Sequence, residues 1–107
     1  MSASVVYVTA ASRDEALAIG RTVIGERLAA CANVLPGMRS IYWWEGQVAE
    51  DDEALLVLKT REVLLAALIA RIRALHSYAT PCITAWPITA GNPDYLAWIA
   101  EATAAAS

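Results

Sequence analysis

At 107 residues the chain has room for one domain with a single core, and residues 1–107 are predicted to form it. The formal net charge of −3 without a basic stripe argues against nucleic-acid binding, while two cysteines, Cys31 and Cys82, are too few for a secreted disulfide framework and favour a reducing, cytoplasmic location. Because apolar residues make up 58% of the chain, a large apolar content must pack beneath a thin charged surface, which favours assembly with copies of itself.

The first part of the chain predicts a strand, a helix and a second strand. Residues 4–10, "SVVYVTA", are β-branched and aromatic, and this apolar run is too short and lacks the charged start expected of a signal peptide or membrane span. Ser12 followed by Glu15 has the form of a capping box, and apolar residues then recur at helical spacing over about four turns. Residues 32–44 are predicted to form a strand that bends at Pro36-Gly37, because proline cannot donate to the ladder.

The middle of the chain predicts a hairpin. Glu45-Gly46-Gln47 is expected to form its turn, with Gly46 supplying the positive φ that such turns need. The returning strand runs from Val48 to Thr60, with an acidic start that gives way to five successive apolar residues at 54–58. Such a run indicates a strand that needs cover on both of its faces.

A helix and a strand are predicted next. From Arg61 to His76 the apolar residues fall on one helical stripe, with Arg71 and Arg73 in the polar sector. Pro81 to Ile88 is predicted to form the fourth strand, and Pro87 places this strand at an edge or a bulge.

The C-terminal segment predicts a short helix. Asn92 is a suitable N-cap with Pro93 at the first helical position, and the helix is expected to run through Trp98, with the Ala-rich end 101–107 fraying. The whole order gives an α+β, ferredoxin-like βαββαβ fold: an antiparallel four-stranded sheet with both helices on one face and a short C-terminal helix.

Three consecutive aromatic residues, Tyr42, Trp43 and Trp44, stand at the end of the predicted hairpin. A tryptophan can bury ~150–250 Å², worth an upper bound of about 4–6 kcal/mol, so leaving both in water forfeits much of a domain's stability. We therefore expect these three residues to pack into a neighbouring subunit. The alternative, that one tryptophan caps its own core beside the C-terminal helix, follows from the alternation of strand faces.

Five collinear blocks resemble the CutA family of divalent-cation-tolerance proteins. They are "ERLAACANVLPG" (26–37), "IYWWEGQV" (41–48), "LLVLKT" (55–60), "LHSYATP" (75–81) and "PDYLAWI" (93–99). The resemblance implies a ferredoxin-like fold assembled into a compact homotrimer through long hairpins and edge strands. It also implies a role in the response to metal ions, binding of copper or another divalent cation as cofactor, and no enzymatic reaction. Some members resemble scaffolding partners of membrane enzymes.

One departure from the family pattern concerns the only histidine. The family reads approximately His-Pro-Tyr-Glu-x-Pro-Glu there, whereas this chain reads "HSYATPC" from His76 to Cys82, so two carboxylates are absent and a thiol is present. The cysteine that some members carry near the end of the first strand aligns with the neighbourhood of Thr9. A metal site carried over from the family would lack those ligands.

Three residues are candidate metal ligands, His76, Cys82 and Cys31, and His76 is placed first among them. Imidazole and thiolate suit copper or zinc, and a trimer could bring them together from different subunits. Each also has a structural interpretation. Cys31 lies among alanines and could be a small buried hydrophobe, Cys82 could belong to the core, and His76 could be a polar residue favoured by the end of its helix.

A second candidate site is a cleft between subunits lined by Lys59, Tyr78 and Trp44, which could bind a small anion or a signalling ligand. The alternative for Lys59 is solvation at the end of its strand. The acidic run 50–53 is interpreted as a solvated strand end that blunts edge pairing, with binding of a hard cation as a weaker choice.

Three classes of function follow from these residues. The first is a metal-responsive homotrimer that binds copper or a similar divalent cation, and it is preferred because of the family resemblance. The second is a ligand-sensing or scaffolding trimer with a small molecule or protein partner in its clefts. The third is a small hydrolase that would use the Cys82 thiol with His76, although no nucleophile elbow is present.

Overall fold

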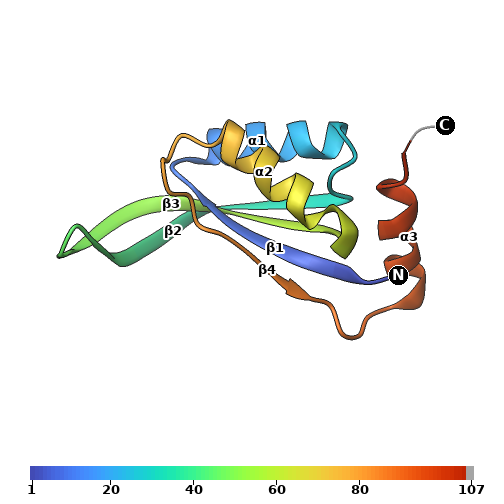
Figure 1. The fold of residues 1–107 in the computed structure, drawn as a ribbon. Coiled ribbons are helices and arrows are strands. Elements are labelled where there is room, and N and C mark those ends of the chain that lie inside the picture. The colour runs from blue at the N-terminus through green and yellow to red at the C-terminus, as the bar shows by residue number, and fades with distance from the viewer. Residues whose placement is uncertain (106–107) are drawn as a thin grey trace.

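The computed structural model describes residues 1–105 of the chain, and its elements follow the predicted order (Figure 1). They are β1 (Ala3–Ala10), α1 (Arg13–Gly25), β2 (Cys31–Trp44), β3 (Gln47–Arg61), a 3-10 turn η1 (Glu62–Leu64), α2 (Leu65–Leu75), β4 (Ile83–Pro87) and α3 (Pro93–Ala102). The four strands pair antiparallel in the order β2-β3-β1-β4. Helices α1 and α2 lie on one face of the sheet, so the ferredoxin-like prediction is confirmed.

Two boundaries in the second half differ from the predictions. Helix α2 begins at Leu65 instead of Arg61, because Arg61 still pairs with Ala3 in the sheet and Glu62–Leu64 form a 3-10 turn. Strand β4 begins at Ile83 instead of Pro81, since its ladder with β1 spans Ile83–Pro87. It is an edge strand, as its proline predicts.

The C-terminal helix is longer than predicted. Helix α3 starts after Asn92, whose side chain accepts a hydrogen bond from the Asp94 N–H (3.2 Å), and it continues past Trp98 to Ala102. The prediction of fraying is therefore wrong for Glu101 and Ala102, which are helical. Within the predicted tail, residues 106–107 lie outside the described residues.

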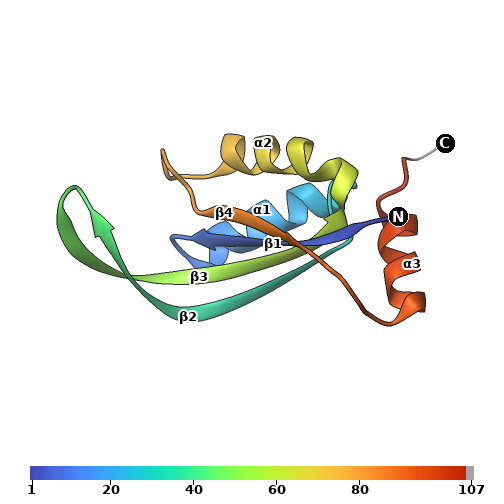
Figure 2. The ribbon, with the colours of Figure 1, turned by 60° about the horizontal axis from the view of Figure 1, so that its bottom comes forward.

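The core lies between the sheet and the two helices. Val6 and Val8 of β1 stand opposite Leu58 and Leu56 of β3, and all four side chains are fully buried beneath α1 and α2. Because side chains alternate along a strand, the intervening residues, such as Val57, face the other side of the sheet. That side carries neither α1 nor α2, as Figure 2 shows from below, and Val57 is only half-buried.

Strands β2 and β3 extend beyond the body as a long twisted hairpin (Figure 1), which gives the molecule extents of 47 × 27 × 22 Å. The predicted bend is present as a register shift between Leu35 and Met38, where Gly37 has a φ of +82°. At the tip, Glu45 and Gly46 have φ values of +51° and +78°, the pattern of a tight two-residue hairpin turn. Gln47, predicted as the third turn residue, instead pairs with Trp44 as the first residue of β3.

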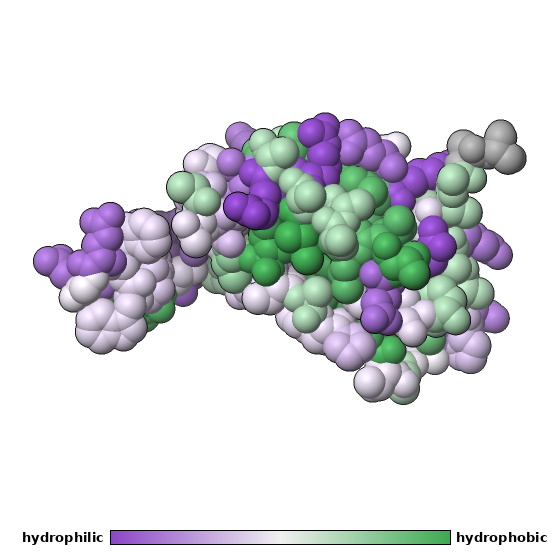
Figure 3. Space-filling model, viewed as in Figure 1, coloured by the Kyte–Doolittle hydropathy of each residue, from purple (hydrophilic) through white to green (hydrophobic). Residues whose placement is uncertain are grey.

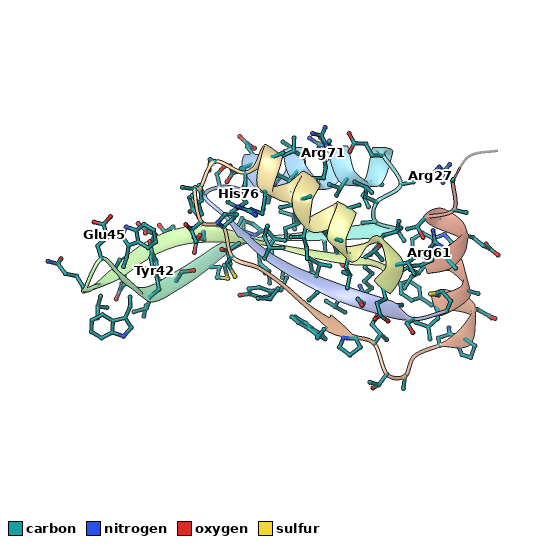
Figure 4. The ribbon with its side chains drawn as sticks, viewed as in Figure 1. Arg27, Tyr42, Glu45, Arg61, Arg71 and His76 are labelled. Atoms are coloured by element: carbon teal, nitrogen blue, oxygen red, sulfur yellow. The ribbon has the colours of Figure 1, made fainter. Side chains whose placement is uncertain are left out.

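Helix α3 closes the end of the sheet opposite the hairpin tip (Figure 1). A second apolar cluster joins Ile99 of this helix to Ala3 and Ala30. The guanidinium groups of Arg27 and Arg61 donate hydrogen bonds to carbonyl oxygens at the end of α3, Arg27 to Ala102 (3.0 Å) and Arg61 to Thr103 (3.0 Å) (Figure 4). Among the described residues, no helix has both the length and the apolar character to cross a bilayer.

Candidate functional site

His76 is buried at the C-terminal end of α2, and its side chain points from there toward β1 (Figure 4). Its Nδ1 accepts a hydrogen bond from the Tyr78 N–H (3.0 Å), which places the proton of the neutral ring on Nε2; this N–H donates to the carbonyl oxygen of Thr9 (2.7 Å). Both ring nitrogens are therefore engaged within the chain. In this arrangement the imidazole holds the loop after α2 against β1 and presents no free lone pair to a metal.

The structure brings Cys82 near His76 but leaves Cys31 elsewhere. The carbonyl oxygen of Cys82 accepts a hydrogen bond from the Thr9 N–H (3.4 Å), on the same residue that His76 contacts. Cys31 pairs with Lys59, which stands opposite Val5 of β1, four residues away from Thr9. Across residues 1–105, no three His, Cys, Asp or Glu side chains are grouped so that they could hold one metal ion. The predicted ligands thus do not form a site within one chain.

Lys59 lies apart from the other two residues predicted for the ligand cleft. Its Nζ is 3.8 Å from the Cys31 Sγ and 5.8 Å from the ring centre of Tyr95 of α3. The Tyr95 hydroxyl also donates toward this Sγ (3.5 Å), and this contact, with burial, raises the pKa of Tyr95 to about 12. The partner of Lys59 is therefore an aromatic ring from the C-terminal helix.

Trp44 and Tyr78 do line one cleft, with a volume of about 790 Å³. It lies between the hairpin, β1 and the loop that follows α2. Its walls are rich in aromatic and sulfur-containing side chains. They include Tyr7, Met38, Tyr42, Trp44, Tyr78 and Cys82. The structure thus brings Trp44 and Tyr78 to one cleft of a single chain and leaves Lys59 outside it, while the cleft between subunits stays a prediction.

A buried carboxylate, Glu53, also belongs to the cleft and is only 9% exposed. Its Oε2 accepts a hydrogen bond from the Tyr78 hydroxyl (3.0 Å). Burial, together with this carboxylate, raises the pKa of Tyr78 to about 12. The phenol therefore stays protonated at neutral pH and remains a donor to Glu53.

The acidic run is divided between the two faces of the hairpin, because side chains alternate along β3. Glu50 and Asp52 form ion pairs with Arg39 (2.9 and 3.1 Å), and their hydrogen bonds raise the pKa of Arg39. Asp51 accepts a hydrogen bond from the Tyr42 hydroxyl, which raises the pKa of that phenol. The four carboxylates thus have separate partners and do not converge as ligands for a hard cation.

The hairpin exposes its aromatic residues. Trp43 is 75% exposed and Trp44 is 52% exposed, so the alternative that one tryptophan caps its own core beside α3 is wrong. Strand alternation does place the two on opposite faces, but at this distance from the body neither face of the hairpin is covered by the core. In Figure 3 the projecting hairpin is mostly pale lilac to purple instead of green, because the hydropathy scale ranks Tyr and Trp below aliphatic residues.

The thiol hydrolase interpretation is not supported by the geometry of His76. A histidine that activates a thiol must accept its proton on a free ring nitrogen. Here Nδ1 accepts from the Tyr78 N–H and Nε2 is protonated toward Thr9. The ring is therefore arranged as a structural support for the loop and not as a base for Cys82.

Residues 4–102 match the family model described as CutA1 divalent ion tolerance protein. The chain belongs to the CutA1 family. The match covers almost all of the described residues, and it confirms the resemblance carried by the five sequence blocks. The CutA1 family is described by tolerance of divalent ions and not by a reaction, which agrees with the prediction that the protein is not an enzyme.

Individual CutA relatives agree in sequence and in structure. Protein CutA 1 of Oryza sativa subsp. japonica, described as chloroplastic, is 46% identical over 99 residues, which cover 92% of this chain and 56% of the rice protein. The divalent-cation tolerance protein CutA of Thermus thermophilus is 46% identical over 99 residues, covering 92% and 96%. The crystal structure of CutA1 from Oryza sativa superposes with a TM-score of 0.95 at 43% identity, covering 99% and 97%.

The match to the rice protein limits what can be carried over to this CutA1 chain. The chain spans little more than half the length of that relative. Its description as chloroplastic concerns the rice protein, so a cytoplasmic location stays a prediction here. Copper is not part of the family description, which names divalent ions only.

Several residues of the site were not singled out from the sequence. The sequence places Glu53 in a solvated acidic run and gives no local sign that Tyr7, Met38 and Tyr95 take part in these contacts. Strand alternation does separate Glu53 from Asp52, because Glu53 faces the same side of the hairpin as Tyr42 and Trp44. The contacts with Tyr78 and Tyr95 join residues far apart in the chain and leave no local signal.

Proposed function

We propose that the chain acts as a homotrimer in the response to divalent metal ions, and that its subunits associate through the hairpin that carries Tyr42, Trp43 and Trp44. The observation that supports this most strongly is the exposure of apolar side chains along the projecting part of the hairpin. Ile41 is 65% exposed, Val48 59% and Trp43 75%. Soluble monomers seldom leave such large side chains in water without a partner, and a second subunit would cover them.

The free edges of the sheet favour the same assembly. Strand β2 is an outer strand of 14 residues, and β4 is the outer strand on the other side. A long outer strand presents unpaired N–H and C=O groups that can pair with another chain. The number of subunits, three, comes from the family resemblance.

We further propose that copper or a similar divalent cation binds where subunits meet. Cys82 is the strongest candidate ligand, because its thiol is exposed on the cleft and thiolates suit copper. Cys31 and His76 are weaker candidates, since Cys31 contacts Lys59 and both nitrogens of His76 are engaged. Ligands from two or three subunits would be required to complete such a site.

The assembly is tested by light scattering on the wild type at micromolar concentration beside Trp43→Ser. We expect the wild type to have three times the chain mass of 11.4 kDa, and the variant to dissociate more readily. Trp98→Ser is the matched control, because this exposed tryptophan lies on α3 at the far end of the molecule. A monomer mass for the wild type would contradict the proposal.

The metal site is tested by calorimetric titration of reduced, metal-free protein with copper, comparing the wild type with Cys82→Ser, Cys31→Ser and His76→Ala. We expect binding in a whole-number ratio per trimer, its loss in Cys82→Ser and its retention in Cys31→Ser. His76→Ala alone is not decisive, because it also releases the loop that carries Cys82. Absence of binding to the wild type, or full retention in Cys82→Ser, would contradict this assignment.

The cleft supports the second candidate function, a trimer that senses or carries a small molecule. Its volume of about 790 Å³ suits a small organic ligand, and it is lined by aromatic rings with few convergent polar groups. This function is the second candidate. One chain is enough to form the cleft, whereas the metal site needs ligands from several chains.

A further inference from the structure

The two faces of the hairpin differ in chemistry. Met38, Tyr42 and Trp44 lie on the face that lines the cleft, and Glu53 stands opposite Met38 on the same face. Arg39, which stands opposite Asp52, also lines the cleft, but its guanidinium is held in ion pairs with Glu50 (2.9 Å) and Asp52 (3.1 Å). The cleft therefore combines aromatic rings, a thioether and a buried carboxylate, and the basic side chain among its lining residues is already paired with carboxylates.

We propose that this cleft binds a small organic ammonium ion, held against the rings of Tyr42, Trp44 and Tyr78 with the Glu53 carboxylate as its counter-charge. Ammonium groups are attracted to the faces of Trp and Tyr rings by the ring quadrupole. A carboxylate at the same site supplies the negative charge that a buried cation requires. The inference goes beyond the proposed metal response and names a ligand class for the second candidate function; it requires that the neighbouring subunit covers the hairpin face that carries Trp43 and Val48 and leaves Tyr42 and Trp44 open to the cleft.

The three tyrosine hydroxyls around the cleft are already engaged as donors, so their oxygens offer lone pairs to an incoming molecule. The Tyr78 hydroxyl donates to Glu53 (3.0 Å), the Tyr42 hydroxyl donates to Asp51, and the Tyr7 hydroxyl is directed at the sulfur of Met38 (3.8 Å). An entering molecule thus meets ring faces and oxygen lone pairs. An ammonium ion, which has charge and donors or methyl groups to offer, is complementary to such a surface.

The state of Glu53 supports a cation in particular. Only one of its oxygens, Oε2, accepts a hydrogen bond within residues 1–105, and the side chain is 9% exposed. A carboxylate removed from water gains most from a positive partner. The neutral Tyr78 hydroxyl donates to one oxygen and brings no positive charge to the site.

The surrounding charges oppose an anion. The run Glu50 to Glu53 carries four carboxylates, and Arg39 neutralises part of this charge through Glu50 (2.9 Å) and Asp52 (3.1 Å). Lys59, the cation expected for anion binding, lies at the other end of the sheet against Tyr95. A small anion therefore has no free basic partner among the described residues that line this cleft.

The direct test is calorimetric titration with choline and with its neutral isostere 3,3-dimethylbutan-1-ol. The two molecules have the same shape, so a difference between them reports the positive charge. We expect choline to bind at least about tenfold more tightly, in keeping with cation–π attraction at a partly desolvated site. Equal binding of both molecules, or no saturable binding of choline, would overturn the proposal.

Charge variants locate the counter-charge. Glu53→Gln should remove most of the preference for choline while its amide oxygen still accepts from the Tyr78 hydroxyl. Asp52→Asn is the matched control: it removes the same charge from the next residue, on the opposite face, and should keep the preference. Equal losses in the two variants would show that only the general field matters and would refute a site on Glu53.

Tryptophan variants test which face of the hairpin binds choline. Trp44→Leu should weaken choline binding by at least about tenfold, the scale of losing one cation–π partner, whereas Trp43→Leu on the other face should not. Sedimentation of the same samples separates the two proposals. A trimer that ignores choline would refute this inference alone, and a monomer that binds it would refute the trimer alone.

Discussion

The two ends of the β2–β3 ladder follow the same strand geometry but have opposite surroundings. In the body, Val34 and Leu56 stand opposite each other beneath α1, and Leu56 is fully buried. In the hairpin, Trp43 and Val48 also stand opposite each other, yet they are 75% and 59% exposed. Both pairs are apolar cross-strand pairs of the same two strands.

The difference separates what one chain explains from what it does not. The buried pairs gain their stability from the helices of the same chain, so the fold accounts for them. The exposed pairs gain little from this chain, because no element covers the hairpin. Their side chains point to a surface used outside the chain, by another subunit or by a ligand.

The largest expected effect contrasts the two ends of β3. Leu58→Ala should destabilise the protein by about 2–5 kcal/mol at any protein concentration, because it opens a cavity in a closed core. Val48→Ala should cost within about 0.5 kcal/mol in dilute solution, and its cost should grow with concentration as subunits associate. Urea unfolding at several protein concentrations measures both.

Two results of these unfolding measurements would contradict the interpretation. A Val48→Ala cost that is small at all concentrations would mean that the hairpin stays uncovered, against the proposed assembly. A Leu58→Ala cost below that of Val48→Ala in dilute protein would contradict the placement of the core.

A smaller effect is expected where the body meets the cleft. His76→Ala should destabilise the protein by about 1–3 kcal/mol, because the Thr9 carbonyl oxygen and the Tyr78 N–H lose their partners. Cys82→Ala, an exposed residue of the same loop, should cost within about 0.5 kcal/mol. Denaturant unfolding measures the pair, and equal costs would show that the imidazole does not anchor the loop.

Local chemistry predicted much of the fold. The Ser12 side chain accepts from the Glu15 N–H (3.1 Å), Gly37 marks the bend with a positive φ, and Gly46 forms the turn, all as the sequence indicates. Each of these features depends on residues within three or four positions of one another. Short-range steric and hydrogen-bond rules therefore suffice for them.

Contacts between residues far apart in the chain determine the element boundaries that the sequence does not predict. Arg61 is kept in β3 by its pairing with Ala3 and by hydrogen bonds to Thr103 (2.9 and 3.0 Å), so the next helix starts late. Periodicity along 61–76 contains no information about either partner. The extension of α3 to Ala102 likewise involves contacts with Arg27 across the fold.

The candidate site was predicted less well for the same reason. Trp44 and Tyr78 line one cleft of the single chain, and Glu53 joins it through a contact with Tyr78, 25 positions away in the chain. Lys59 was grouped with them although its ammonium group faces Tyr95, 36 positions later. Residue types indicated what the surface could bind, while the twist of the hairpin determined which residues meet there.

The smallest expected effect is a pH dependence at the start of α1, in the body. Burial would raise the pKa of Glu15, but hydrogen bonds from Ser77 and from the Ala11 N–H outweigh it and leave the pKa below its usual value. A lowered folded-state pKa stabilises the protein above the unfolded pKa of about 4.3, and this stabilisation is lost as the pH falls through the folded value.

Glu15→Gln should therefore lower the free energy of unfolding at pH 7 by less than about 1 kcal/mol, because the carboxylate is only half-buried and remains screened by solvent. The difference from the wild type should shrink as the pH falls below about 4, where the unfolded carboxyl is protonated. Asp14→Asn, which removes the same charge from the same helical turn, is the control for the helix dipole. Since Glu15 also accepts from the Ser77 N–H (2.9 Å), a pH-independent difference would mean that it joins α1 to the loop after α2 by its shape alone.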